Sequence, residues 1–387
     1  IPVAIQIFET GLGLEFDAQI SGTKSDHENK VNKAKKRKRQ PNNDAIKSPK
    51  NIQIDEDYKY IDYSETDTDG IPLKVSRKWF RKIDENGNVY FLTSEDSKLL
   101  YSAYELFLDA TFAPTSGFKH LFPQLEIFST RKDLGNQKIM GIPCAFVLTT
   151  SKTEANYKLI LKTIKEIVKT DLADGGPDAE LAPESFYVDF EKSMINAINQ
   201  IFPGVRINNC FFHTLQSWRR KLCQLGFKPK IEKNNKNFDP KFREFFDFIS
   251  GIPNTNLHIS NFRKKIVSEL ENYKKILKLN DFEKEQFSEF LNYLNKFYLS
   301  DTAKFPFKNW EQFSAITSNP DFSRTTNISE SLHSSLNRNF PRKINFNNAI
   351  EKIYNFKKEN LMAHAALSPK KYYNIKNKPS TKRSIRP

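Results

Sequence analysis

Between residues 104 and 225, short apolar runs alternate with stretches of helical spacing. Strand-like runs lie at 104–112, 120–128, 139–149, 185–189 and 205–212. Apolar stripes of helical spacing lie at 157–168, 194–202 and 215–225. Ser151 and Glu154 have the spacing of a capping box before the first of these helices. The order β-β-β-α-β-α-β-α predicts an α/β fold, with helices flanking a mixed sheet of five strands.

Beyond residue 226 the pattern becomes helical throughout. Helical stripes lie at 242–249, 260–279 and 282–299, and two further helices are predicted at 328–339 and 346–366. We therefore expect an α/β core at 104–226, which an all-helical insertion at 227–322 interrupts. The helices of 323–366 are expected to complete that core.

The segments outside this pattern are polar and charged. We expect residues 1–75 to be largely disordered, 76–103 to lead into the core, and 367–387 to form a basic tail. Residues 33–39 (KAKKRKR) carry six cations in seven positions, which predicts a nuclear import signal or a nucleic-acid arm. A solvated charge run would have the same pattern. The segment 368–387 contains seven Lys or Arg and no acid, which favours contact with phosphate.

Composition narrows the class of protein. The 387 residues include 33 Phe and 14 Tyr, enough for a substantial core, and a net charge of +15 attracts polyanions. Three Cys (Cys144, Cys210 and Cys223) do not form a disulfide framework and suit a reducing compartment. No apolar run reaches the roughly 18 residues of a membrane span, and no signal peptide is evident. We expect a nuclear protein with a nucleic-acid partner and no membrane partner. Because the sequence begins at Ile1, an upstream DNA-binding module would lie outside it.

Two aspartates stand where carboxylates can bind ligands. Asp109 lies inside an apolar strand-like run, where an unpaired carboxylate is costly. Asp189 ends another such run, and strand ends in α/β sheets are ligand sites. The first and fourth strands are expected to be neighbours, so the two acids would repel each other unless a cation lay between them. Their oxygens favour Mg²⁺ or Mn²⁺. The alternative is that each is an ordinary hydrogen-bonding carboxylate.

The strand order, with one Asp in the first strand and one after the fourth, resembles the ribonuclease H-like fold. Residues 91–112 (FLTSEDSKLLYSAYELFLDATF) are similar to the stretch that leads into the first catalytic Asp of Mutator-like (MULE) transposases. Those enzymes also have a second Asp before a helix, a C-x-x-H pair, a helical insertion and a Glu. The corresponding features here are Asp189, Cys210 with His213, residues 227–322 and Glu330. The resemblance covers roughly residues 83–366.

This resemblance implies a DDE transposase in which Asp109, Asp189 and Glu330 are catalytic and bind Mg²⁺ or Mn²⁺. Such an enzyme cleaves double-stranded DNA at the terminal inverted repeats of a transposon and joins the ends to target DNA. We expect a homo-oligomer, because two ends must be handled together.

Glu330 is weighed separately because it lies off the apolar stripe of its helix. That stripe consists of Ile328, Leu332, Leu336 and Phe340. Glu330 falls on the other face, with Asn327, His333 and Asn337. Either this polar face points into the metal site, or Glu330 is an ordinary surface residue or a cap partner of Asn327.

Cys210 and His213 have the spacing of two zinc ligands, but a closed zinc site needs four. We expect this pair to support the active site by packing or hydrogen bonding. Basic residues on two helices are candidates for DNA contact. The first group, which includes an aromatic residue expected to be exposed, is Trp218, Arg219, Arg220 and Lys221, and the second is Arg338, Arg342 and Lys343. A buried Trp218 with solvated cations is the alternative for the first group.

The family often carries zinc-binding modules upstream or downstream of this core. The present sequence has only three Cys, so we expect neither the upstream nor the downstream zinc-binding module in it. Whether it recognises a specific DNA site, and whether it is active, therefore stay open questions. Three other functions remain as alternatives. They are a domesticated DNA-binding protein without catalysis, a ribonuclease H-like nuclease acting on RNA or hybrids, and a charged scaffolding protein.

Overall fold

The computed structural model describes residues 48–66, 72–133, 139–173, 180–189, 191–209, 211–252, 260–300, 302–310, 327–338, 340–341 and 343–366. All of them fall within one compact unit, Asn43–Pro387. The basic run at 33–39, the segment 367–387, Cys210 and Arg342 lie outside the described residues. The backbone of Glu330 is described, but its side chain is not.

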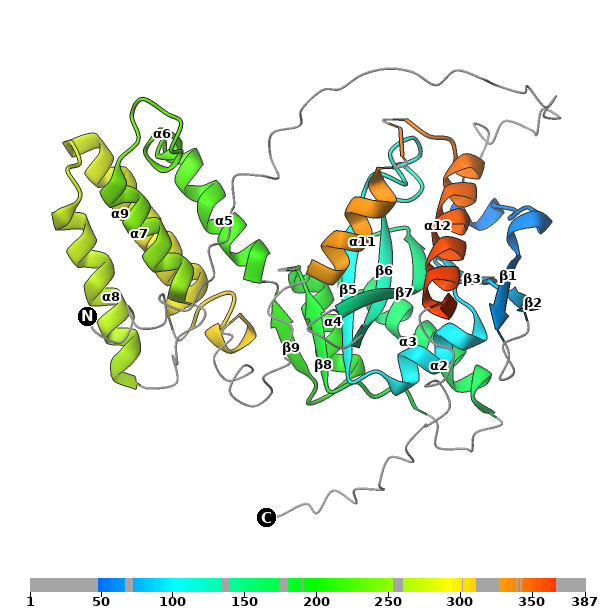
Figure 1. Cartoon of the computed structure of the whole chain (residues 1–387). Helices are drawn as coiled ribbons and strands as arrows, with labels where there is room; N and C mark the ends of the chain where they lie inside the picture. Colours follow the sequence, from blue (N-terminus) through cyan, green and yellow to red (C-terminus); the bar gives the residue numbers. More distant parts are fainter. Residues whose placement is uncertain are drawn as a thin grey trace, which may run out of the picture. The chain divides into compact units, whose positions relative to one another are not determined.

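Seven strands form one mixed sheet, in the order β3-β4-β7-β6-β5-β8-β9 (Figure 1). Their bounds are β3 (Phe80–Ile83), β4 (Val89–Phe91), β5 (Glu105–Thr111), β6 (Gln124–Asp133), β7 (Ile139–Thr149), β8 (Ser185–Val188) and β9 (Arg206–Asn209). The strands β5, β8 and β9 run parallel to one another, whereas β5-β6, β6-β7, β7-β4 and β4-β3 pair antiparallel. The α/β architecture is therefore confirmed, and the sheet has two strands more than predicted.

The boundaries of two predicted strands were wrong. The second strand begins at Gln124, because residues 112–123 form a turn-rich loop. The last strand, β9, ends at Asn209, because the next helix already begins at Phe211. The first helix is capped by Thr153 and not by the predicted capping box of Ser151 and Glu154. The side chain of Thr153 accepts a hydrogen bond from the Asn156 N–H.

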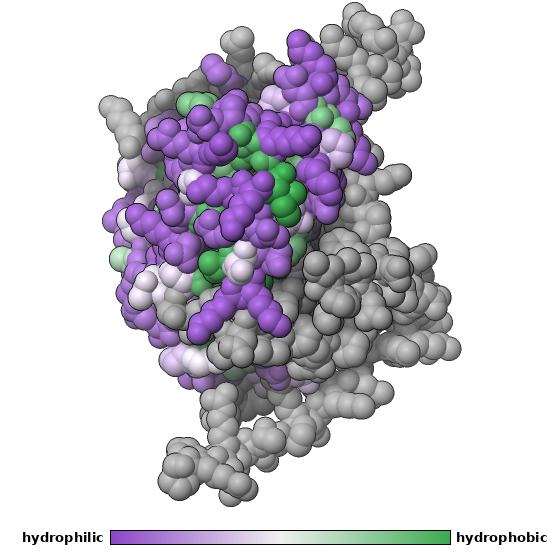
Figure 2. Space-filling view, turned by 90° about the vertical axis from the view of Figure 1, so that its left-hand side faces the viewer, coloured by the Kyte–Doolittle hydropathy of each residue, from purple (hydrophilic) through white to green (hydrophobic). Residues whose placement is uncertain are grey.

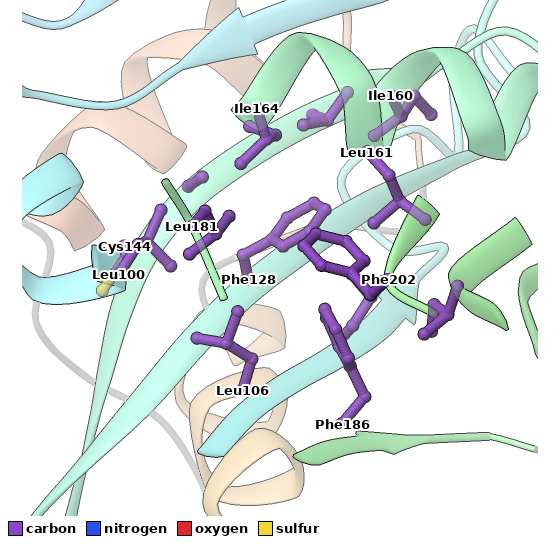
Figure 3. Packing of buried hydrophobic residues seen from close by; sticks show 14 of the residues in the cluster. Leu100, Leu106, Phe128, Cys144, Ile160, Leu161, Ile164, Leu181, Phe186 and Phe202 are labelled. Carbon is purple, nitrogen blue, oxygen red and sulfur yellow. The ribbon is translucent and has the colours of Figure 1, made fainter. Parts of the chain in front are cut away.

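The alternation of side chains gives the sheet two apolar faces. On one face, Phe107, Ile127 and Tyr187 pack with residues of α11 (Asn327–Asn337) and α12 (Phe346–Ala366). On the other face, side chains of β5, β6 and β8 pack beneath α2 (Ser94–Ser102), α3 (Glu154–Asp171) and α4 (Lys192–Ile201). Figure 3 shows this second core, where Ile160 and Ile164 of α3 lie over the sheet. The sheet is consequently covered on both sides, as its apolar strands require.

The prediction that residues 1–75 are largely disordered was wrong for their described part. Strands β1 (Tyr60–Thr66) and β2 (Pro72–Lys78) pair antiparallel, after short 3₁₀ turns η2 (Pro49–Asn51) and η3 (Glu56–Tyr58). Ile61 and Tyr63 are buried in the same core as α12, whereas Asp62 and Ser64, which alternate with them, are exposed. This alternation is that of a half-buried strand, and the surrounding acidic residues obscured it.

A helical block follows β9 and has a core of its own. It contains α5 (Phe211–Gln224), α6 (Lys228–Ile231), α7 (Pro240–Gly251), α8 (Ser260–Ile276), α9 (Asp281–Leu294), the π-helical turn η6 (Asn295–Leu299) and the 3₁₀ turn η7 (Phe307–Asn309). Its core includes three residues of α5, the helix that we expected to belong to the α/β core, and the residue that follows this helix. These are Leu215, Trp218, Leu222 and Leu225. By its packing, the helical block therefore begins at α5.

The outer surface of this block is mainly hydrophilic. Seen from the side on which α8 lies in Figure 1, it shows only small hydrophobic patches (Figure 2). Among the described side chains of α8, α9 and the residues between them, the exposed large apolar ones are Val267, Ile276 and Phe282. None of the helices in the described part of the chain is long and apolar enough to cross a membrane.

Candidate active site

Asp109 and Asp189 occupy the same level on two neighbouring parallel strands. Strand β5 pairs with β8 so that Leu108 lies opposite Val188. The next residues outward are Asp109 and Asp189, at the edge of the sheet where β8 ends. The expected adjacency of the first and fourth strands is therefore confirmed, and it brings the two acids to one edge of the sheet.

Asp109 is buried on the face that α11 and α12 cover. It lies opposite Ile127 of β6, a residue of that core, and is 4% exposed. Its Oδ1 atom accepts a hydrogen bond from the Ala110 N–H at 2.8 Å. A carboxylate in this position needs polar or charged neighbours, because burial alone disfavours its ionised form.

The polar face of α11 supplies some of these neighbours. His333 Nδ1 lies 3.4 Å from Asp109 Oδ2, and the Thr111 hydroxyl donates to Asn337 Oδ1 at 3.0 Å. His333 and Asn337 are one turn apart and lie on the same face of the helix. Asp109 and Thr111 are two residues apart and lie on the same face of β5. Of the two possibilities for the polar face of α11, its His333 and Asn337 thus contact β5, whereas the role of Glu330 stays a prediction. Glu330 lies on α11 three residues before His333, but its side chain is outside the described residues.

The first turn of α5 brings a second histidine to Asp189. His213 Nδ1 lies 2.5 Å from Asp189 Oδ1, and the Asn209 side chain donates to the backbone oxygen of Asp189 at 3.2 Å. The other half of the predicted C-x-x-H pair, Cys210, lies outside the described residues. His213 therefore contacts one of the two acids directly, in agreement with the supporting role expected for it.

Burial determines the protonation of His333. Its side chain is 13% exposed, and desolvation lowers its pKa to about 4, although the nearby Asp189 carboxylate acts in the opposite direction and His213 in the same direction. The imidazole is therefore neutral near pH 7. It orders the site by contact and brings no positive charge to the two acids.

A buried polar network on the opposite face of the sheet was missed in the sequence. Glu126 lies opposite Ala110, and its pKa is raised to about 8, chiefly by burial and next by the charge of Glu191. Gln124 donates to Glu126 and, at 2.8 Å, to the Tyr157 hydroxyl, which donates to Glu191 at 3.0 Å. Glu191 follows Asp189 by two residues, so this network ties the segment after β8 to α3. Two polar residues at strand spacing, Gln124 and Glu126, were the signal for it.

Of the two possibilities for Trp218, a ring exposed to DNA or a buried ring, the structure shows the buried one. Its ring is fully buried, with the rings of Tyr298 and Trp310 at centroid distances of 5.4 and 5.7 Å. The helical block needs a large apolar side chain at this point of its core, so Trp218 is not available to stack on a base.

The cations beside Trp218 differ in their partners. Arg219 lies 3.4 Å from Glu232, and Lys221 lies 2.5 Å from Glu289, so nearby acids offset both charges. Arg220 is exposed and donates to Gln216. Arg338 and Lys343, near the end of α11, are exposed as well. Arg220, Arg338 and Lys343 therefore fit a role in DNA contact better than Arg219 and Lys221.

The described residues contain no group of three or more His, Cys, Asp or Glu side chains arranged to hold a metal ion. Asp109 and Asp189 are the two carboxylates at the edge of the sheet that could hold one, and the third predicted ligand, Glu330, has no described side chain. Cys144 and Cys223 are free thiols, and Cys144 is buried.

Residues 106–217 match the family model of the MULE transposase domain. The matched segment contains Asp109, Asp189 and His213 and ends before α11. The match supports a relationship to Mutator-like transposases, and hence a transposase-related function, as the resemblance of the sequence implied. No curated protein matches the chain.

Proposed function

We propose that this chain is the catalytic core of a DDE-type transposase of the Mutator-like kind. It would cleave phosphodiester bonds of double-stranded DNA at transposon ends and join those ends to target DNA. The observation that carries this proposal is the placement of Asp109 and Asp189 at one level of two parallel strands, on the face that the polar side of α11 contacts.

The topology supports a ribonuclease H-like core. The five strands predicted from the sequence follow the order β7-β6-β5-β8-β9 within the larger sheet, and β6 is antiparallel to both of its neighbours. The first acid is in the central strand β5, and the second directly follows β8. The matched segment, 106–217, contains both acids.

The donor atoms at this edge fit a divalent cation. The side chain of Asp189 is 44% exposed at this edge of the sheet, and its Oδ1 atom lies 2.5 Å from His213 Nδ1. Carboxylate oxygens are the ligands that Mg²⁺ and Mn²⁺ prefer. Asp109, Asp189 and Glu330 would hold the metal. When bound, such ions activate a water or a 3′-hydroxyl and stabilise the leaving oxygen.

The protein's own groups would keep the acids in place. The Ala110 N–H fixes one oxygen of Asp109, while His333 lies beside the other. The Tyr157–Glu191 bond and the contact of His213 hold the segment that carries Asp189 from two sides. A rigid frame of this kind favours reaction, because the groups do not have to reorganise when substrate binds.

A plasmid assay tests the proposal. The full chain should nick supercoiled DNA with Mg²⁺ or Mn²⁺ and not with EDTA. Asp109→Asn, Asp189→Asn and Glu330→Gln should each lower the rate by about 100-fold or more. Glu359→Gln, which changes an exposed acid of α12, is the matched control and should keep the wild-type rate.

The outcomes separate the competing functions. Equal rates for the three variants and the control would overturn the catalytic proposal. Binding of DNA without any metal-dependent cleavage would indicate a domesticated DNA-binding protein, and faster cleavage of RNA or of an RNA–DNA hybrid would indicate a nuclease. A nuclear location, suggested by residues 33–39, and a homo-oligomer, suggested by the resemblance, are parts of the same proposal.

A further inference from the structure

An exposed aromatic ring lies at the end of the strand that carries Asp109. Phe112 directly follows β5, three residues after Asp109, and is 51% exposed. The ammonium group of Lys152 lies over the ring, 4.5 Å from its centroid. Lys152 follows the end of β7, which runs in the same direction as β5, so both residues lie at the edge of the sheet where the two acids meet.

The loop that begins with Phe112 is firmly packed. The Thr115 hydroxyl donates to the backbone oxygen of Phe112 at 3.3 Å. The rings of Phe118 and Phe122 contact Phe346 of α12, at centroid distances of 5.4 and 6.1 Å. The exposed ring therefore belongs to an ordered surface.

A single exposed apolar residue is common and needs no explanation by itself. Phe112 differs in its surroundings, because an ammonium group lies against it and the proposed catalytic acids lie at the same edge of the sheet. An aromatic ring beside a cation is the combination that binds single-stranded DNA, with a base on the ring and a phosphate on the cation. Tyr104, at the opposite end of β5, is 58% exposed and offers a matched position away from the acids.

We propose that Phe112 and Lys152 form a subsite for an unpaired DNA nucleotide at the edge of the sheet where the catalytic acids lie. This inference rests on the proposed function, since it assumes a DNA substrate at this edge. The base would stack on the Phe112 ring, and the Lys152 ammonium would contact the adjacent phosphate. The subsite would thus hold a frayed or cleaved strand end near Asp109 and Asp189.

Binding of fluorescent DNA tests the subsite without any cleavage. The full chain, in buffer with EDTA, would be titrated against a blunt duplex and against the same duplex with a three-nucleotide 3′ overhang that contains 2-aminopurine. Phe112→Ala should weaken binding of the overhang by about tenfold and leave binding of the blunt duplex unchanged. Phe112→Trp should keep the preference for the overhang, and Lys152→Gln should reduce it. Stacking should quench the 2-aminopurine in wild type and less so in Phe112→Ala.

Tyr104→Ala is the control for loss of an exposed aromatic residue and should behave like wild type. The subsite is overturned if Phe112→Ala affects both DNAs equally, or if Phe112→Ala and Tyr104→Ala give the same result. The proposed function can fail separately. If no cleavage occurs in the plasmid assay but the preference still depends on Phe112, the subsite stands in a protein that binds DNA. Thermal unfolding of each variant shows that it is folded.

Discussion

His333 and Asp109 are 224 positions apart in the sequence, yet Nδ1 of the first lies 3.4 Å from Oδ2 of the second. The contact joins α11 to β5, and a second one joins α5 to the segment after β8, where His213 lies 2.5 Å from Asp189. Each acid thus has a histidine neighbour that a helix supplies. The position of these helices therefore influences how the two carboxylates are oriented.

Replacing His333 should impair the reaction while leaving the fold intact. His333→Ala removes the neighbour of Asp109, and loss of such a supporting contact typically lowers metal affinity or activity about 10–100-fold. We expect a slower plasmid-nicking rate and a higher Mg²⁺ concentration for half-maximal rate. His120→Ala, which changes an exposed histidine, is the control. Equal rates and equal Mg²⁺ dependence for the two variants would show that the His333 contact has no part in the reaction.

Glu126 should make the stability of the protein depend on pH. Its pKa is raised from 4.5 to about 8, so the folded protein keeps this proton in a range where the unfolded chain loses it. The stabilising effect of protonated Glu126 is full below pH 4.5 and is lost as the pH rises toward 8, by up to about 1.4 kcal/mol per pH unit. Glu126→Gln, which cannot ionise, should remove this slope. Urea denaturation of both proteins at pH 5, 6, 7 and 8 measures the free energy of unfolding. If it changes with pH equally in both proteins, the prediction is wrong.

The placement of Asp109 beside Asp189 could be predicted from the order of the strands and from the residue types along them. Both acids end or interrupt apolar runs, and the order of elements makes the first and fourth strands neighbours. The polar face of α11 was also readable, since Leu332 and Leu336 fix which side is buried. Spacing along the chain determines these features.

Other features depend on residues far away in the sequence. Trp218 follows a pattern that fits an exposed or a buried ring, and only the packing of Tyr298 and Trp310 against it decides. The strands β3 and β4 have four and three residues, too few to establish a period. The contact of His333 with Asp109 likewise follows from tertiary packing, which no local pattern reveals.

Gly117 should tolerate no side chain. A Cβ atom there would lie 1.9 Å from the backbone oxygen of Ile344, in the link between α11 and α12. Gly117→Ala must push the loop 112–123 away from this link, at a cost of about 1–3 kcal/mol or more. We expect a lower free energy of unfolding and weaker binding of overhang DNA, because Phe112 belongs to the displaced loop. Lys119→Ala, at an exposed position of the same loop, should leave stability within about 0.5 kcal/mol of wild type. A stable Gly117→Ala protein would contradict the close approach.

The positive charge of Lys357, in α12, should stabilise the fold. Its side chain is 1% exposed, and its ammonium group lies 2.5 Å from Asp96 of α2 and 2.7 Å from the backbone oxygen of Pro143. Lys357→Met would leave the Asp96 carboxylate buried without this cation, so we expect the free energy of unfolding to fall by about 3–5 kcal/mol. Lys358→Met, at the next and partly exposed position, should change it by no more than about 0.5 kcal/mol. Adding Asp96→Asn to Lys357→Met should recover part of the loss, because it removes the uncompensated charge. Urea denaturation measures all three variants, and equal midpoints for the two single variants would show that the ion pair does not stabilise the fold.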